Sequence, residues 1–143
     1  MKCTVKIDPY AEEEVVIHAH ARSALVDEIE GLVRCHSIEL IGYKEDKIAV
    51  LRPSEICCFC VEGGKIYAMT VCEKWQLKQR LYTVEAMLDA GFVKINQSCI
   101  VQLKHVVRFE SSIAGALTVI LKNGYRDYVS RRQLKIVKER MGL

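Results

Sequence analysis

The chain has 143 residues, of which half are hydrophobic, and its formal net charge is +3. This size suits one ordinary domain or two small ones, and the apolar share excludes wholesale disorder. No apolar run approaches the roughly 20 residues that a membrane span needs, and residues 1–8 lack a long apolar stretch, so we expect neither a membrane span nor a signal peptide. Seven cysteines at irregular spacing do not suggest a disulfide framework, so we expect reduced thiols and a cytoplasmic protein.

The charge is unevenly distributed along the chain. Residues 1–51 hold six basic and ten acidic side chains, which gives −4, whereas residues 52–143 hold 15 basic and eight acidic ones, which gives +7. Basic charge that is concentrated in one domain is typical of a protein that binds a polyanion. We therefore predict an acidic N-terminal part and a basic part that binds nucleic acid.

The acidic part shows two kinds of apolar spacing. Alternation from Cys3 to Ile7 and from Val15 to Ala21 predicts strands, and a helical spacing follows with Ser23 as a plausible N-cap. Together these patterns predict a small α+β extension of the type ββαββ. Its predicted elements are strands over 3–7 and 15–21, a helix over 25–33, and strands over 38–41 and 48–51.

The basic part reads mainly as antiparallel strands. Glu62–Lys65 and Asn123-Gly124 each lie between apolar runs, and an Asn-Gly pair in that position is a strong hairpin signal. We expect Gly91 to end a short helix and Ser130 to cap the last one. The predicted elements are strands over 56–61, 66–71, 77–81, 92–95, 106–109, 117–121 and 125–129, and helices over 83–89 and 131–140.

Three segments of the basic part occur in an order typical of one family. They are Lys65-Ile66-Tyr67-Ala68-Met69-Thr70, then Gly91-Phe92-Val93-Lys94-Ile95-Asn96-Gln97-Ser98-Cys99-Ile100-Val101, then Asn123-Gly124 followed by Tyr128-Val129-Ser130-Arg131-Arg132. Together they resemble the LytTR family of bacterial DNA-binding domains, over about Pro53 to Leu143. The whole chain is similar to stand-alone LytTR proteins that carry a short extension.

The resemblance implies a mainly β fold of two sheets, without an enzyme active site or a cofactor, whose loops enter successive major grooves of double-stranded DNA. It also implies a homodimer on paired DNA repeats and regulation by a neighbouring membrane protein. We thus predict a LytTR-like DNA-binding domain at 52–143 and a regulatory or dimerisation extension at 1–51. The residues expected at the DNA are Lys65, Lys94, Asn96, Gln97, Ser98, Lys104, Arg131 and Arg132.

The role that we expect for each of these residues depends on its side-chain type. Many LytTR members have His-Arg or His-Asn where this chain has Asn96-Gln97, and both amides can read adenine in the major groove, although both residues could instead simply form the loop. Two arginines at a helix start are electrostatically unfavourable without an anion nearby, which favours a DNA contact for Arg131. We expect the lysines to meet phosphates, which carry no sequence information.

Other interpretations remain open at this point. A metal or redox site could use Cys57, Cys58, Cys60 and Cys72, although they do not show the usual pairing of zinc ligands on turns. A protein-interaction module without specific DNA binding could use the acidic extension. No phosphate loop or nucleophile elbow accompanies the four histidines, so we predict neither an enzyme nor a small-molecule substrate. These histidines are His18, His20, His36 and His105.

Overall fold

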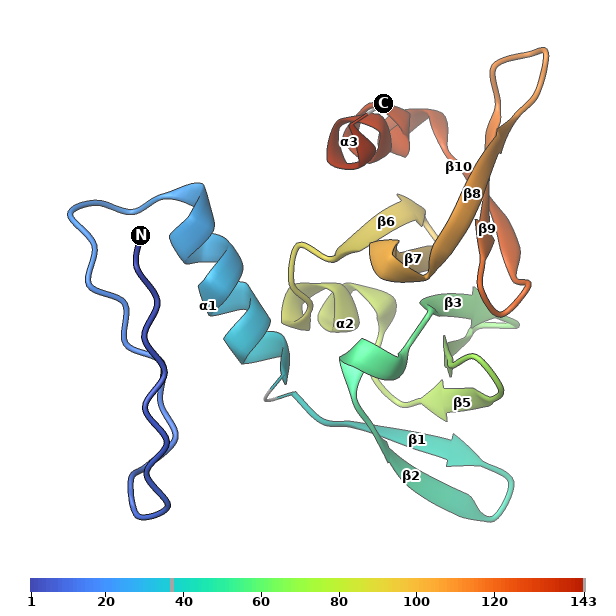
Figure 1. The fold of residues 1–143 in the computed structure, drawn as a ribbon. Coiled ribbons are helices and arrows are strands. Elements are labelled where there is room, and N and C mark those ends of the chain that lie inside the picture. The colour runs from blue at the N-terminus through green and yellow to red at the C-terminus, as the bar shows by residue number, and fades with distance from the viewer. Residues whose placement is uncertain (37, 143) are drawn as a thin grey trace.

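In the computed structural model, which describes residues 1–36 and 38–142, two antiparallel sheets and two helices form one body, and the N-terminal segment lies outside it (Figure 1). We call residues 40–142 the body and residues 1–22 the arm. Helix α1 (Ala24–His36) stands between them. The mainly β, two-sheet fold predicted from the sequence is therefore confirmed.

The larger sheet has seven strands in the order β2-β1-β5-β4-β3-β7-β6. Every neighbouring pair in it is antiparallel, and hairpins join most neighbours along the chain. Its strands are β1 (Leu40–Lys44), β2 (Lys47–Leu51), β3 (Cys58–Glu62), β4 (Lys65–Met69), β5 (Lys74–Leu77), β6 (Phe92–Asn96) and β7 (Cys99–Gln102).

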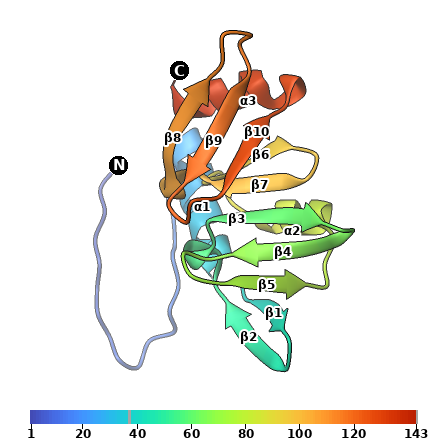
Figure 2. The ribbon, with the colours of Figure 1, turned by 90° about the vertical axis from the view of Figure 1, so that its right-hand side faces the viewer.

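The smaller sheet has the order β10-β9-β8 and packs against the larger one beside α3 (Figure 2). Helix α2 lies on the opposite side of the larger sheet, where Leu81 and Val84 enter its core. The remaining elements are β8 (Val106–Ser111), β9 (Leu117–Leu121), β10 (Arg126–Val129), α2 (Leu81–Met87), α3 (Arg131–Met141) and the short 3-10 helices η1 (Pro53–Glu55) and η2 (Leu103–His105).

Two apolar cores lie on the two faces of the larger sheet. Successive side chains of a strand point to opposite faces, so β3 supplies Phe59 to one core and Cys58 to the other. The Phe59 ring lies 5.9 Å from the ring of Phe92 in the first core. The second core lies between the sheets, where Val137 of α3 is completely buried. This second core holds the smaller sheet and α3 in place.

The two predicted hairpin turns are both present. Gly63 and Gly64 have φ of +57° and +76°, and a two-residue turn of this kind requires positive φ at both positions. At the other turn, the Asn123 side-chain oxygen accepts a hydrogen bond from the Tyr125 backbone N–H at 3.0 Å, and Gly124 has φ of +82°. Local residue chemistry therefore determines both turns.

The first two predicted strands are wrong. Residues 3–7 and 15–21 form no strand, because neither segment has a neighbouring strand to supply backbone hydrogen bonds. The helix and its cap are confirmed, since the Ser23 hydroxyl accepts a hydrogen bond from the Val26 N–H at 3.3 Å. The last two strands form as the β1–β2 hairpin, but this hairpin joins the larger sheet through β5. In place of the predicted ββαββ extension, the structure has an arm without strands, the helix α1, and two strands that belong to the larger sheet of the body. The functional division at residue 51 stays a prediction.

Two smaller boundaries also differ from the predictions. The strand predicted over 77–81 is β5, which ends at Leu77, and Leu81 already begins α2. Gly91 does not end that helix, because α2 stops at Met87 with the next residue in extended conformation. The Gly91 N–H instead donates to the Asp89 carboxylate at 2.8 Å. Polar turn chemistry after the helix, rather than a left-handed glycine, leads the chain into β6.

Candidate nucleic-acid interface

Three segments of the basic part meet at one edge of the body. The Val61 N–H at the end of β3 donates to the Ser98 carbonyl at 2.8 Å, which places the β3–β4 turn beside the β6–β7 turn; Figure 2 shows both turns at the right-hand edge. The Ser130 N–H donates to the Ile95 carbonyl at 2.8 Å, which holds the start of α3 against β6. Thus the loops expected at DNA are neighbours in space.

Asn96 ties the β6–β7 turn to β10. Its side-chain N–H donates to the Tyr128 carbonyl at 2.9 Å, and its side-chain oxygen accepts from the Ser98 N–H at 2.8 Å. The side chain is only 2% exposed, so both polar ends are occupied inside the protein. The loop-forming interpretation of Asn96 therefore fits the structure, and the predicted base contact does not.

Gln97 and Ser98, which follow Asn96, differ from it in exposure. Gln97 and Ser98 are both exposed at the tip of the β6–β7 turn. Of the amide pair predicted to read bases, only Gln97 is accessible to a base edge. The sequence contained a signal for this division: an Asn directly before a tight turn commonly bonds to the backbone two residues later.

Arg131 and Arg132 occupy the first turn of α3, and both are exposed. Ser130 stands at the N-cap, but its hydroxyl makes no capping hydrogen bond, so the predicted side-chain cap is wrong. The Ser130 carbonyl instead accepts from the N–H groups of Gln133 and Leu134 at 3.0 Å. Neither arginine forms an ion pair with another residue of 1–36 or 38–142. Two unpaired cations at the positive end of a helix dipole favour an approaching anion.

The lysines of the predicted set are placed differently from one another. Lys65 is exposed at the start of β4, and the nearby Glu62 is engaged by Lys74, a hydrogen bond that raises the pKa of Lys74. Lys94 is half-buried on β6. Because Lys74 neutralises the Glu62 carboxylate, this carboxylate does not offset the positive charge of Lys65 beside the β3–β4 turn.

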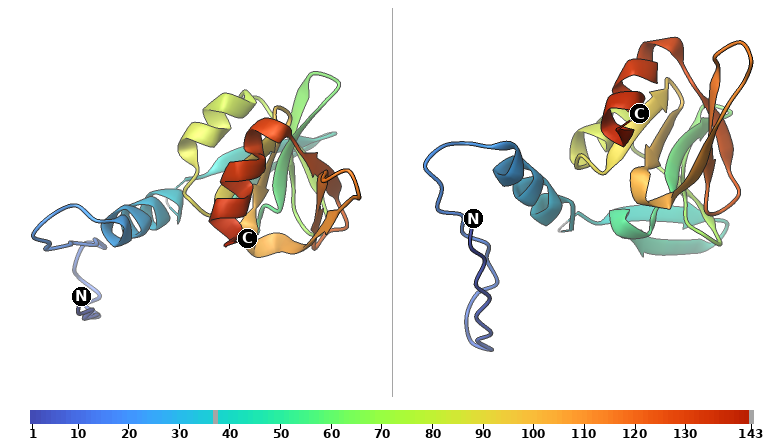
Figure 3. Two further views of the ribbon diagram at one scale, coloured as in Figure 1. Left: turned by 90° about the horizontal axis from the view of Figure 1, so that it is seen from above. Right: turned by 45° about the horizontal axis from the view of Figure 1, so that its top comes forward.

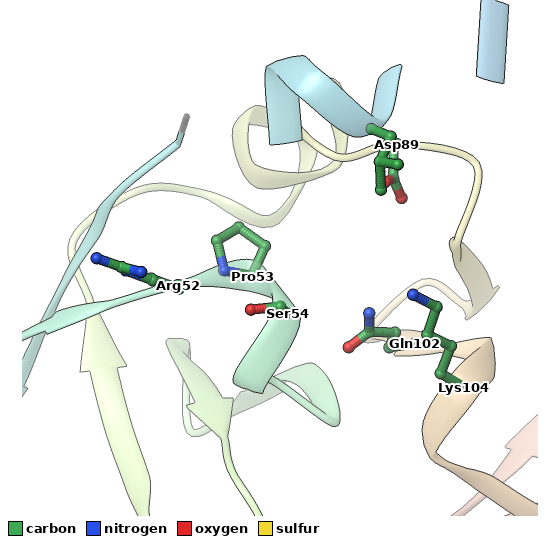
Figure 4. Close-up of a pocket in the computed structure, with 7 residues that line it drawn as sticks. Arg52, Pro53, Ser54, Asp89, Gln102 and Lys104 are labelled. Atoms are coloured by element: carbon green, nitrogen blue, oxygen red, sulfur yellow. The ribbon is translucent and has the colours of Figure 1, made fainter. Parts of the chain in front are cut away.

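Lys104 lies apart from the three loops. It follows β7, whereas Ser98 precedes this strand, so the two residues lie at opposite ends of it. Figure 4 shows Lys104 beside Gln102 in a small pocket that α1 also lines, with Arg52 on the opposite side of the pocket. The structure therefore does not bring Lys104 to the edge that holds Gln97 and Arg131.

The cysteines do not build the alternative metal site. Of the four cysteines of this alternative, Cys57, Cys58 and Cys60 are buried, whereas Cys72 is exposed beyond β4. The part of the chain that the structure describes contains no group of three metal-binding side chains. Burial raises the pKa of Cys60 to about 12. A hydrogen bond with Cys58 and burial raise the pKa of Cys99. Cys60 and Cys99 are therefore buried core residues.

A comparison with protein families identifies the body. The model of the LytTr DNA-binding domain matches residues 46–142, which is most of the chain. The chain belongs to the LytTR family. Its body is therefore the DNA-binding domain of a transcription regulator, which is not an enzyme class.

Relatives of this LytTR chain extend the likeness to its N-terminal part. A Staphylococcus aureus (strain MSSA476) protein named as an uncharacterized HTH-type transcriptional regulator is 31% identical over 137 residues, which cover 92% of this chain and 91% of that protein. A protein of the same description from Staphylococcus aureus (strain COL) is 29% identical over 136 residues. Because the match covers 92% of this chain, the similarity includes at least part of the arm, and α1.

A solved structure supports the fold of the body. The LytTr DNA-binding domain of a Bacillus cereus protein, described as a methyl-accepting/DNA response regulator, superposes with a TM-score of 0.68 at 18% identity. The match covers 73% of this chain and 97% of that domain. The two-sheet architecture is therefore that of a solved LytTr domain. No helix among residues 1–36 and 38–142 is both long enough and apolar enough to cross a membrane.

Proposed function

We propose that this LytTR chain is a transcription regulator that recognises specific double-stranded DNA by inserting loops into the major groove. One observation supports the proposal above the others: Gln97 and Arg131 are exposed on neighbouring segments that Asn96 holds together. An exposed Gln can read adenine bidentately and an Arg can read guanine bidentately. The two residue types needed for direct readout thus stand at one edge.

Positive charge around this edge supplies the contact to the DNA backbone. Lys65, Arg132 and Lys94 surround the proposed readers and come from the three converging segments. Cations of this kind bind phosphates, fix the orientation of the protein and carry no sequence information. We place the phosphate contacts on these side chains. Ser98, at the tip of the β6–β7 turn, is a further DNA contact, to either a base or a phosphate.

The regulator we propose works in the cytoplasm as a homodimer on paired repeats, under the control of a neighbouring membrane protein. The resemblance to stand-alone LytTR proteins supports this assembly, and residues 1–51 are its regulatory part. Their net charge of −4 also supports a role away from the phosphate backbone, which repels negative charge.

The experiment is a titration of the full chain against labelled fragments from its own promoter region at several salt concentrations. We expect one fragment to bind more tightly than shuffled DNA of the same composition. Binding should weaken steeply with added salt, because phosphate contacts release counterions. Equal affinity for the promoter fragment and the shuffled DNA at moderate salt would contradict a specific regulator.

A further inference from the structure

The arm and α1 leave a large apolar surface uncovered. Val5, Ile7 and Tyr10 are 77%, 89% and 97% exposed, and Leu25 on α1 is exposed as well. Figures 1 and 3 show the arm standing away from the body, with α1 leading from the arm to the body. Exposed apolar side chains that are concentrated in one part of a soluble protein favour an interaction site there.

Helix α1 turns its apolar stripe away from its own body. A side chain on Gly31 would come within 3.4 Å of the Asp89 Cβ, so the Gly31 side of the helix faces the body. At 3.6 residues per turn, Ile29 lies about 200° around the helix from Gly31, and Val26 about 140°. The stripe formed by Leu25, Val26 and Ile29 therefore lies on the side away from the body, with Leu25 exposed and Val26 and Ile29 half-buried. An apolar stripe on this side of an amphipathic helix requires a partner.

The arm cannot cover this stripe of its own helix in the observed arrangement. Arg22, where the arm meets α1, is hydrogen-bonded to Asp27 at 2.7 Å and to Glu30. Asp27 lies about 160° around the helix from the middle of the stripe, by the same helical geometry. These ion pairs hold the end of the arm on the acidic side of α1. Figure 2 shows the rest of the arm as an open loop.

We propose that the arm is exchanged between two copies of this chain, so that residues 2–8 of each copy lie on the α1 stripe of the other. The arm alternates apolar and polar residues, so an extended arm has one apolar side that can be buried against an apolar helix stripe. Residues 1–36 also provide enough residues for one side of a stable interface, which takes about 20–30. One symmetric contact thus covers both exposed surfaces.

Charge favours a second copy as the partner. Lys2 and Lys6 lie among the apolar residues of the arm, and Glu28 lies on α1 between Leu25 and Leu32 at helical spacing. None of these three charged residues forms an ion pair with another residue of the described ranges. An exchanged arm brings its lysines to the free carboxylate of the partner's helix.

This inference specifies the homodimer of the proposed function, and sedimentation of the full chain over a concentration series tests it. We expect the wild type to dimerise, and Val5→Asp/Ile7→Asp and Leu25→Asp each to weaken the dimer by more than about tenfold, because charges then replace buried apolar groups. Val71→Asp is the control, since Val71 is also an exposed apolar residue but lies on the body. A monomeric wild type, or arm and helix variants that dimerise like the control, would overturn the proposal.

A charge exchange distinguishes contact between chains from contact within one chain. Lys6→Glu and Glu28→Lys should each weaken dimerisation, and an equal mixture of the two variants should restore it, because each mutated arm then meets a mutated helix. Failure of the mixture to restore the dimer would contradict the exchange. DNA titration of the same variants keeps the two proposals separate: a stable dimer that binds no DNA specifically counts against the proposed function alone.

Discussion

The body and the N-terminal segments differ in how much of their apolar surface they cover. Among residues 1–34 only Gly31 is buried, whereas residues 40–142 contain both apolar cores. The apolar residues of the arm alternate as in a strand, yet among the residues that the structure describes none of them belongs to either core. The difference shows that an apolar pattern acquires structure only when a second surface is available to bury it.

The largest expected effect separates the two regions by stability. Phe59→Ala should lower the free energy of unfolding by about 3–5 kcal/mol, because it removes a fully buried ring from the first core. Tyr10→Ala removes an aromatic ring of the arm and should change it by less than about 0.5 kcal/mol. Urea unfolding followed by circular dichroism measures both. Similar losses of unfolding free energy in the two variants would contradict the difference in packing between the body and the arm.

A second prediction separates two adjacent amides within the body. Asn96→Ala should destabilise the fold by about 1–3 kcal/mol, since it leaves the Ser98 N–H and the Tyr128 carbonyl without their partner. Gln97→Ala should leave stability within about 0.5 kcal/mol of the wild type. Thermal unfolding of both variants tests this assignment, which is wrong if Gln97→Ala proves the more damaging change.

A third prediction compares side chains at the proposed DNA-binding edge with a side chain that lies away from it. Gln97→Ala and Arg131→Ala should each cost about 1–3 kcal/mol on the preferred fragment and much less on shuffled DNA, because a base contact is lost. Lys104→Ala is the matched control, since this cation lies at the far end of β7. If Lys104→Ala loses discrimination as strongly as Arg131→Ala, the DNA-facing edge has been assigned wrongly.

The smallest expected effect concerns pH. Burial raises the pKa of Cys60 to about 12 and also raises that of Tyr125, so the folded chain keeps protons that the unfolded chain releases. Stability from these groups is present below about pH 9 and declines as the pH rises from there toward 12. Cys60→Ala should flatten this decline in urea unfolding measured from pH 8 to 11. An equally steep decline in the Cys60→Ala variant would show that other groups cause the loss of stability at high pH.

Sequence reasoning succeeded where the determining contacts are local. The glycines of the Gly63-Gly64 turn and the hydrogen bond of Asn123 belong to a few adjacent residues, so the residue types alone predict both hairpins. The Ser23 cap is equally local. The family motifs likewise predicted the mainly β body and the LytTR membership.

It failed where the outcome depends on residues far apart in the sequence. Alternation in the arm predicted strands, but no strand lies beside it. The pairing of β1 with β5 and the bond between Asn96 and Tyr128 join segments more than 30 residues apart, and no local pattern encodes them. The division of labour between Asn96 and Gln97 therefore became visible only in the folded chain.

The two hydrogen bonds of Asn96 have a consequence for the thermodynamics of association. They fix the β6–β7 turn and the strand that leads into α3 when the protein folds, so these segments do not have to be ordered again when a ligand arrives. The loss of conformational entropy is already included in folding, and rigid groups bind with a smaller entropic penalty. An edge of this kind is preorganised, and calorimetry of its association should show little contribution from coupled folding.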